Sequence, residues 1–309
     1  MEFVNIFFDY QFQVGDPVLK FLYDIMPSRT IYVAILAAEW YNRHIRIKGR
    51  ARMKITVLTE NTSPRGLLYE HGLSIYIETG YKKILFDTGQ SGIFAENAER
   101  LGIDLSAVDF AVLSHGHYDH GGGLARFFEL NGRAPVYMSS RAFGDHFNAE
   151  GKYIGIDKAL RQSERIILCE NAVSLGEGIA LRPAGEVREI IDFGSAGLSM
   201  EINGRRTPDD FAHEQYLMIE ENGKRILFSG CAHKGIINIV ERFKPDIVFG
   251  GFHFMKTPLG DTLRGYAERL ASYDTIYYTC HCTGAEQYAF IKPYIKSLSY
   301  ISAGDRIEI

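Results

Sequence analysis

The residues best suited to chemistry lie together in residues 114–123, whose sequence is SHGHYDHGGG. Four of them, His115, His117, Asp119 and His120, carry side chains that proteins use as metal ligands. Alternate residues of extended backbone face the same way, so His115 and His117 can bind one ion together. Asp119 and His120 come after the chain turns, which offsets them toward a second ion. Three glycines then let the backbone approach closely before a helix expected over residues 124–130.

This motif follows one of two similar segments, residues 73–89 and residues 216–230. Each segment alternates apolar and polar residues around a glycine-containing turn, which is the pattern of a β-hairpin. A helix and a strand are expected after each hairpin, over residues 93–101 and 110–114 in the first half and 235–243 and 246–252 in the second. The two expected strands lead to His115 and His253.

Two halves of this kind would bury their apolar faces by packing sheet against sheet, with the helices outside. The predicted fold class is therefore α/β (α+β), a four-layer αββα sandwich of two similar halves over residues 53–309. Loops from both halves should converge at one edge of it. Residues 139–210 have the character of an insertion that would lie over the site as a lid, and their arginines and lysines could hold a phosphate or carboxylate.

Residues 1–52 differ from the rest, being aromatic at first and then basic, and are predicted to be an N-terminal extension. A clean strand pattern begins at Met53 with the residues KITVL that follow it. One interpretation is that the working protein begins near Met53 and the preceding sequence is an upstream mis-start. The other is an accessory helix that covers a partner or dimer surface, as in a homo-oligomer.

Composition excludes several classes of partner. The 309 residues carry a net charge of −4 and the basic residues are dispersed, so no basic patch is expected that could bind a nucleic-acid backbone. The longest apolar run near the start, residues 30–38, is far shorter than the ~20 residues of a membrane span, so no membrane is expected as a partner. The four cysteines do not have the spacing of a disulfide framework, which predicts a cytoplasmic location.

The motifs together resemble those of the metallo-β-lactamase superfamily. The HxHxDH pattern at residues 115–120, with FDTG at residues 86–89 upstream, carries this resemblance over residues 53–305. Further motifs are similar to a subgroup named for a dihydropterin–ribofuranosylaminobenzene phosphate synthase. These are EHGLS at 70–74, GCAHKGIINI at 230–239, GGFH at 250–253 and HCTG at 281–284. The resemblance implies the fold predicted above and is weak guidance to the substrate, because one fold hosts many activities.

The resemblance also implies roles for particular residues. His115 and His117 would hold a first ion, and Asp119 and His120 a second. His281 matches the last ligand histidine of the superfamily. Asp87 matches the carboxylate that orients ligands.

One position departs from the family pattern, because Cys231 stands where many relatives have a bridging aspartate. Either the thiolate of Cys231 is a ligand or His233, two residues on, takes over, and His233 is preferred. His213 competes for the third ligand position of the first ion. The expected cofactors are two divalent metal ions, zinc by preference, with manganese or iron suited to the same ligands.

The predicted function is a binuclear metal-dependent hydrolase that attacks a small anionic ester through a metal-bound hydroxide. Candidate substrates are phosphoesters, thioesters and lactones. Asp119 would orient the hydroxide as well as bind metal. His253 or His71 would protonate the leaving group.

Two alternatives stay open. The first is the pterin–aminobenzene riboside phosphate synthase reaction, a transfer on the same fold. The second is a non-enzymatic di-iron redox or sensor domain. Redox relatives of that kind carry a carboxylate where His117 stands, and a sensor with a degraded site would not be expected to keep the intact set of ligands.

Overall fold

The computed structural model describes residues 52–309, which form one compact unit. The extension predicted over residues 1–52 therefore lies almost entirely outside the described residues, and both interpretations of it stay predictions. Within residues 52–309, no helix is long and apolar enough to span a membrane.

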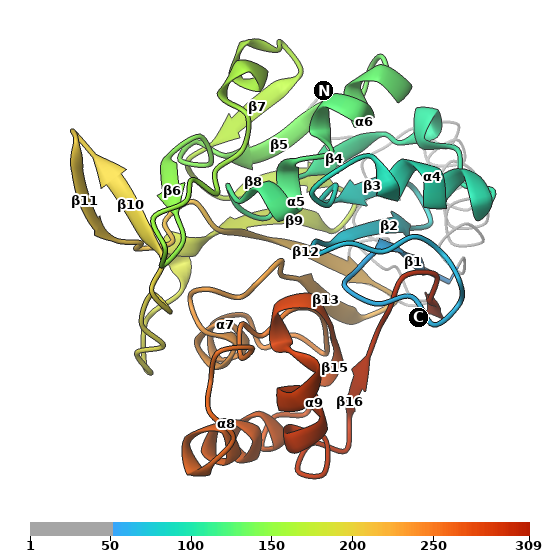
Figure 1. Cartoon of the computed structure of the whole chain (residues 1–309). Coiled ribbons are helices and arrows are strands. Elements are labelled where there is room, and N and C mark those ends of the chain that lie inside the picture. The colour runs from blue at the N-terminus through green and yellow to red at the C-terminus, as the bar shows by residue number, and fades with distance from the viewer. Residues whose placement is uncertain (1–51) are drawn as a thin grey trace, which may run out of the picture. The chain divides into compact units, whose positions relative to one another are not determined.

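Two seven-stranded sheets make up the centre of the structure (Figure 1). The first sheet has the order β17 (Arg306–Glu308), β1 (Lys54–Thr59), β2 (Ser74–Glu78), β3 (Lys83–Phe86), β4 (Phe110–Val112), β5 (Val136–Ser139), β7 (Ile166–Cys169). The second has the order β16 (Leu298–Tyr300), β15 (Ile276–Thr279), β14 (Ile247–Gly250), β13 (Lys224–Phe228), β12 (Gln215–Glu221), β9 (Ile179–Pro183), β8 (Val173–Gly176). Central strands such as β14 are buried along their whole length, as expected of strands covered on both faces.

The two halves predicted from the repeated segments are present. Strands β2 and β3 pair as an antiparallel hairpin, and so do β12 and β13. Helix α4 (Ile93–Arg100) and helix α7 (Ile236–Phe243) follow these hairpins, and each leads to a parallel neighbouring strand, β4 or β14. Phe86 and Phe228, the equivalent residues of the two hairpins, meet between the sheets with ring centroids 5.9 Å apart.

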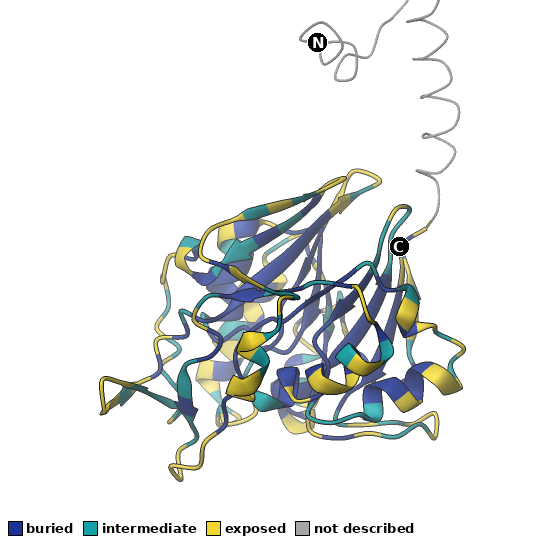
Figure 2. Ribbon diagram, turned by 90° about the horizontal axis from the view of Figure 1, so that it is seen from above, coloured by how far each residue is buried: buried dark blue, intermediate teal, exposed yellow. Residues whose placement is uncertain are grey.

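Three apolar layers hold the sandwich together. One core lies between the two sheets and contains Phe86, Phe228 and Phe249. A second packs the outer face of the first sheet against α4 and α6 (Leu124–Leu130). A third packs the second sheet against α7, α8 (Asp261–Ala271) and α9 (Ala285–Ile291). Figure 2 shows the buried strands inside and exposed residues on the outer sides of the helices. The predicted αββα architecture is confirmed.

Residues 139–210 are divided between the main sheets and a small additional sheet. Strands β7, β8 and β9 of this stretch extend the two seven-stranded sheets. The additional sheet contains β11 (Arg205–Pro208), β10 (Ser199–Ile202) and β6 (Asp145–Phe147), in that order, and β10 and β11 project at the left of Figure 1. Only part of the predicted insertion is therefore separate from the sandwich.

Candidate metal centre

The candidate site lies where the loops after several strands meet at one edge of the sandwich. His281, after β15, donates its backbone N–H to Glu60, after β1, at 2.6 Å. Cys231, after β13, has its Sγ 3.2 Å from Nε2 of His120, after β4. These contacts join both halves, as the strand-end argument predicted.

The turn that carries the HxHxDH motif depends on glycine. Helix α5 (Tyr118–Gly121) begins directly after His117, which places Asp119 and His120 in a helical turn. A Cβ atom on Gly122 would lie 2.3 Å from the carbonyl oxygen of Gln90, and one on Gly123 would lie 2.3 Å from that of Thr88. Side chains at these positions would push the ligand turn away from the loop after β3.

The first candidate ligand group contains His115, His117 and His233. One ring nitrogen from each lies within 4.8 Å of the others, and all three side chains are buried. His115 Nε2 and His233 Nε2 are 3.3 Å apart. Nε2 of His117 and Nδ1 of His233 are buried without a hydrogen-bond partner. The structure thus brings together the three residues preferred for the first ion.

The second candidate group contains Asp119, His120 and His281. His281 Nε2 lies 3.2 Å from His120 Nε2 and 3.3 Å from Asp119 Oδ2. His120 Nε2 lies 3.9 Å from the same carboxylate oxygen. One carboxylate and two imidazoles at these separations form a donor set typical of zinc and similar divalent ions.

Hydrogen bonds at the Nδ1 atoms determine which ring nitrogens are free to bind a metal. Ser114 Oγ donates its proton to Asp87 Oδ2 at 2.7 Å. The Ser114 Oγ atom therefore acts as the acceptor for His115 Nδ1, at 2.8 Å. His120 Nδ1 donates to Asp87 Oδ2 at 2.7 Å. His281 Nδ1 donates to Asn61 Oδ1 at 2.8 Å. Nε2 of His115, His120 and His281 therefore carries a lone pair, the form in which imidazole binds a metal ion. The donor set fits two divalent ions.

Comparison with known proteins agrees with this geometry. The model of the metallo-beta-lactamase superfamily matches residues 69–281. The chain belongs to this superfamily.

Three relatives indicate where in the superfamily its similarities lie. An uncharacterised protein of Methanocaldococcus jannaschii is 32% identical over 241 residues, which cover 74% of this chain and 90% of the relative. The 7,8-dihydropterin-6-methyl-4-(beta-D-ribofuranosyl)-aminobenzene-5'-phosphate synthase of the same organism is 32% identical over 213 residues, covering 60% and 71%. A solved metal-dependent hydrolase of the beta-lactamase superfamily is 29% identical, with a TM-score of 0.72 and coverage of 83% of this chain and 99% of that one.

Burial and charge shape the electrostatics of this metallo-beta-lactamase centre. Burial holds the pKa of His115 well below its usual value, and neighbouring His120 and His117 add to the effect. Burial raises the pKa of Asp119, but the nearby imidazoles of His120, His281 and His71 outweigh it and hold this pKa well below its usual value. Burial opposes a proton on His120, yet Asp87 and Asp119 raise its pKa overall. The two carboxylates therefore favour a positive charge at the position where the second ion is expected.

Cys231 and His213, the two alternatives to His233 as a ligand of the first ion, have different partners in the centre. Cys231 is buried, with Sγ 3.2 Å from His120 Nε2, and forms a candidate group with His115 and His120. Burial raises the pKa of its thiol well above the usual value, and Cys282 adds to the effect. His213 accepts the backbone N–H of Gly116 at its Nδ1, at 2.9 Å. The geometry keeps Cys231 as an alternative ligand and gives His213 a different set of partners.

A pocket of about 220 Å³ opens onto the centre. Asp119, His71 and His253, the residues expected to act in catalysis, all line it. Burial lowers the pKa of His253 to about 4, and the positive charge of Lys256 adds to the shift. His71 Nε2 lies 3.4 Å from Asp119 Oδ2 and half of its side chain is exposed.

The stretch predicted as a lid contributes part of the pocket wall through Asn148, Ile154, Ala196 and Leu198. Among residues 52–309, Lys256 is the one lysine or arginine that lines the pocket. None of the basic residues of the 139–210 stretch lines this pocket, whereas Lys256, from the loop after β14, does.

Several residues that support the ligands escaped the sequence analysis. Glu60 is fully buried and accepts from the His281 backbone and from the Tyr300 hydroxyl, at 2.6 and 2.7 Å. Asn61 accepts from His281 Nδ1, and Glu214 accepts the backbone N–H of His233 at 2.8 Å. Their position in the sequence could have indicated this role, because Glu60 and Asn61 directly follow the first strand of the domain and so lie at the same edge of the sandwich as the motif.

Proposed function

We propose that this protein is a hydrolase that uses two divalent metal ions to cleave a small anionic ester. The observation that supports it most is the convergence of imidazole lone pairs. His120 and His281 approach at 3.2 Å through Nε2 atoms that both carry a lone pair, because the Nδ1 atom of each donates elsewhere. His115 and His233 also approach through Nε2 atoms, at 3.3 Å. Two lone pairs so close repel each other unless a cation or a proton lies between them.

His115, His117 and His233 would hold the first ion, and Asp119, His120 and His281 the second. Zinc is the preferred occupant because the donors are mainly imidazoles, with manganese or iron as alternatives. Bound divalent ions would polarise the ester and activate water near neutral pH. The chain then needs no serine or cysteine nucleophile for this reaction.

The protein groups at the pocket suit the orientation of water, hydrogen bonding to a leaving group and an anionic substrate. Asp119, ionised because its pKa is held low, can orient the attacking water through its carboxylate. His253 faces the pocket beside Lys256. Its depressed pKa keeps it neutral near pH 7, so it can donate a hydrogen bond to a leaving group and is not suited to protonate it, which the sequence had led us to expect it to do. The Lys256 ammonium can pair with a phosphate or carboxylate of the substrate. A volume of about 220 Å³ favours a small substrate.

A synthase reaction on the same centre is the second candidate function. It is supported by the similarity to the dihydropterin–aminobenzene phosphate synthase, which is 32% identical over 213 residues. The ligand geometry serves both reactions, since either uses metal-polarised oxygen atoms.

A cytoplasmic location is also part of the proposal. All four cysteines are free and buried, which supports a reducing compartment. Small molecules are the proposed partners, and self-association as a homo-oligomer stays a prediction.

The test is elemental analysis of the purified protein together with turnover of a chromogenic phosphodiester, a thioester and a lactone. Two equivalents of metal are expected in the wild type, with metal and turnover reduced in His117→Ala and Asp119→Ala. Asp246→Asn, whose carboxylate accepts the Arg225 backbone N–H away from the pocket, is the matched control and should keep both. Two equivalents without turnover of any ester would favour the synthase reaction, and a protein that binds no metal would refute the proposal.

A further inference from the structure

One short segment contacts the first-ion ligands from several directions. This segment, residues 209–215, leads into β12 and is defined here as the 209–215 turn. His213 Nδ1 accepts the backbone N–H of Gly116, the residue between His115 and His117, at 2.9 Å. Phe211 stacks on the ring of His233, with centroids 4.4 Å apart and planes inclined by 9°. All three ligands of the first ion thus depend on contacts with the 209–215 turn.

Gly116 leaves little room for any other arrangement. A Cβ atom on this residue would lie 2.1 Å from the carbonyl oxygen of Ala142. The Gly116 peptide is therefore held between Ala142 on one side and His213 on the other. A change in the Gly116 N–H contact would move the His115–His117 pair, because both flank this peptide.

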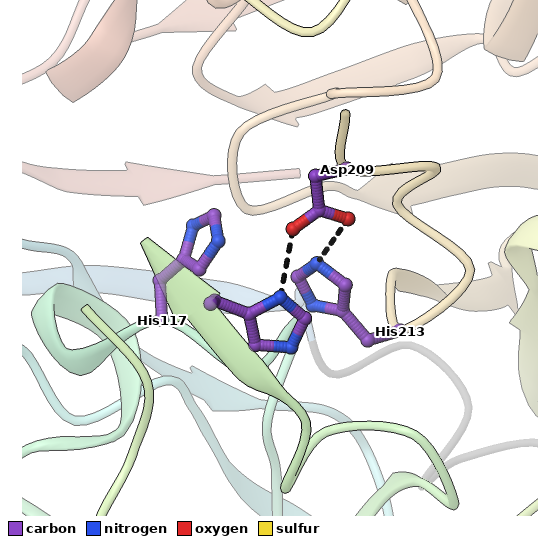
Figure 3. Close-up of side chains that lie close together, drawn as sticks. His117, Asp209 and His213 are labelled. Carbon is purple, nitrogen blue, oxygen red and sulfur yellow. Dashed lines mark hydrogen bonds and ion pairs between the residues drawn. The ribbon is translucent and has the colours of Figure 1, made fainter. Parts of the chain in front are cut away.

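Asp209 fixes the orientation of the histidine that makes this contact (Figure 3). Its carboxylate accepts from His146 Nδ1 at 2.7 Å, lies 3.4 Å from His213 Nε2, and accepts the Phe211 backbone N–H at 2.8 Å. The rings of His146 and His213 lie against each other, with centroids 3.9 Å apart. Since Nδ1 of His213 accepts a hydrogen bond, its proton resides on Nε2, facing the Asp209 carboxylate.

We propose that His213, oriented by Asp209, is a positioning residue that holds the Gly116 peptide and thereby sets the His115–His117 pair for the first metal ion. The inference rests on the metal centre of the proposed function. It assigns His213 to a support role, although its place in the sequence made it a candidate ligand.

A third metal site is the competing explanation of this cluster. His117, His146, Asp209 and His213 are all buried and offer ligand atoms within 4.8 Å of one another. The hydrogen bonds argue against it. His213 cannot accept from Gly116 at Nδ1 and also offer a lone pair at Nε2 unless the ring loses both protons. His146 donates to Asp209 from Nδ1 and keeps a lone pair on its buried, unpartnered Nε2. Without His213 the group has three donors, and one of them, His117, is already assigned to the first ion.

Two substitutions at residue 213 separate the support role from simple loss of packing. Asparagine places an oxygen near the position of the imidazole Nδ1, so His213→Asn can still accept from Gly116. Glutamine reaches the Nε2 position, so His213→Gln keeps a donor for Asp209 but loses the acceptor. We expect His213→Gln to weaken binding of the first zinc ion roughly 10- to 100-fold, the range found for residues that orient ligands. His213→Asn should stay close to the wild type.

Zinc affinity is measured on the full chain by titration against a competing chelator, with thermal unfolding of the zinc-free forms as the folding check. Asp209→Asn adds an independent test, because it removes the negative charge that lies 3.4 Å from His213 Nε2 and leaves one oxygen, which the His146 N–H can take. Its matched control is Asp210→Asn, since Asp210 is exposed and accepts the Ala212 backbone N–H.

The outcomes separate the two proposals. The positioning role is supported if the wild type binds two zinc ions, His213→Gln weakens the zinc affinity and His213→Asn preserves it. Equal losses in both variants, or no loss in either, overturn it while leaving the metal centre intact. A third zinc equivalent that disappears in Asp209→Asn overturns it in favour of a metal site, and a wild type that binds no zinc overturns both proposals.

Discussion

His120 and His281 face each other through Nε2 atoms 3.2 Å apart, and each has its Nδ1 proton bound to another residue. Asp87 binds the proton of His120, and Asn61 binds that of His281. Two hydrogen bonds made outside the pocket thus aim two lone pairs at a common point inside it. The same principle applies to His115 through Ser114. Metal affinity should therefore be sensitive to residues that never touch the metal.

The first prediction concerns Asp87. In Asp87→Asn the side chain has one carbonyl oxygen for three donors, the Ser114 backbone, the Ser114 hydroxyl and His120 Nδ1. We expect zinc affinity to fall roughly 10- to 100-fold, as chelator competition would measure. Asp246→Asn, which alters a strand-end aspartate outside the pocket, should leave affinity unchanged. Unaltered affinity in Asp87→Asn would show that His120 does not need this carboxylate.

The second prediction separates Cys231 from His233 as ligands. If His233 completes the first site, His233→Ala should lose one equivalent of zinc and Cys231→Ser should keep two. The reason is that His233 Nε2 lies 3.3 Å from Nε2 of His115, a candidate ligand of the first ion, whereas Cys231 Sγ lies 3.2 Å from Nε2 of His120, a candidate ligand of the second. Elemental analysis after dialysis against metal-free buffer measures the stoichiometry. The reverse result, loss in Cys231→Ser alone, would assign the thiolate as the ligand.

The parts of the fold that the sequence predicted are those encoded locally. The repeated hairpins were visible because alternation of apolar residues sets which face of a strand is buried, and Phe86 and Phe228 indeed meet between the sheets. The HxHxDH motif was visible because its four ligand side chains lie within six residues. Strands β7 to β9 were missed inside the 139–210 stretch, since short strands such as β8, with half of its residues exposed, carry little periodic signal.

The supporting residues of the site could not be predicted from local pattern. Asn61 binds a histidine 220 positions away, and Glu60 binds the same residue's backbone across 221 positions. Such contacts depend on which strands become neighbours and in what register, which no short motif encodes. The use of His213 as an acceptor for Gly116 is of the same kind, across 97 positions.

The third prediction concerns the pair of equivalent phenylalanines. Phe228 is fully buried and packs on Phe86 and on Phe249, with ring centroids 5.9 and 5.0 Å away. Phe228→Ala should lower the free energy of unfolding by about 3–5 kcal/mol, because it removes the ring and leaves a cavity between the sheets. Urea unfolding of the metal-free protein measures the change. Phe290→Ala, at a half-buried residue of α9, should cost distinctly less, and equal losses would contradict the role assigned to the inter-sheet core.

The fourth prediction concerns pH. Burial and Lys256 lower the pKa of His253 from 6.5 to about 4. Between these values the unfolded chain binds the proton more readily than the folded protein, so the free energy of unfolding rises with pH. The contribution is intact above pH 6.5 and is lost as pH falls toward 4, with an upper bound of about 3 kcal/mol.

Urea unfolding of the metal-free protein at pH 7 and pH 5 should show this loss, and His253→Asn should reduce it. His71→Asn, at a half-exposed histidine of the same pocket, is the control. If His253→Asn leaves the difference between the two pH values unchanged, the imidazole of His253 is not held neutral by its surroundings, and its assignment as a neutral N–H donor to the leaving group fails with it.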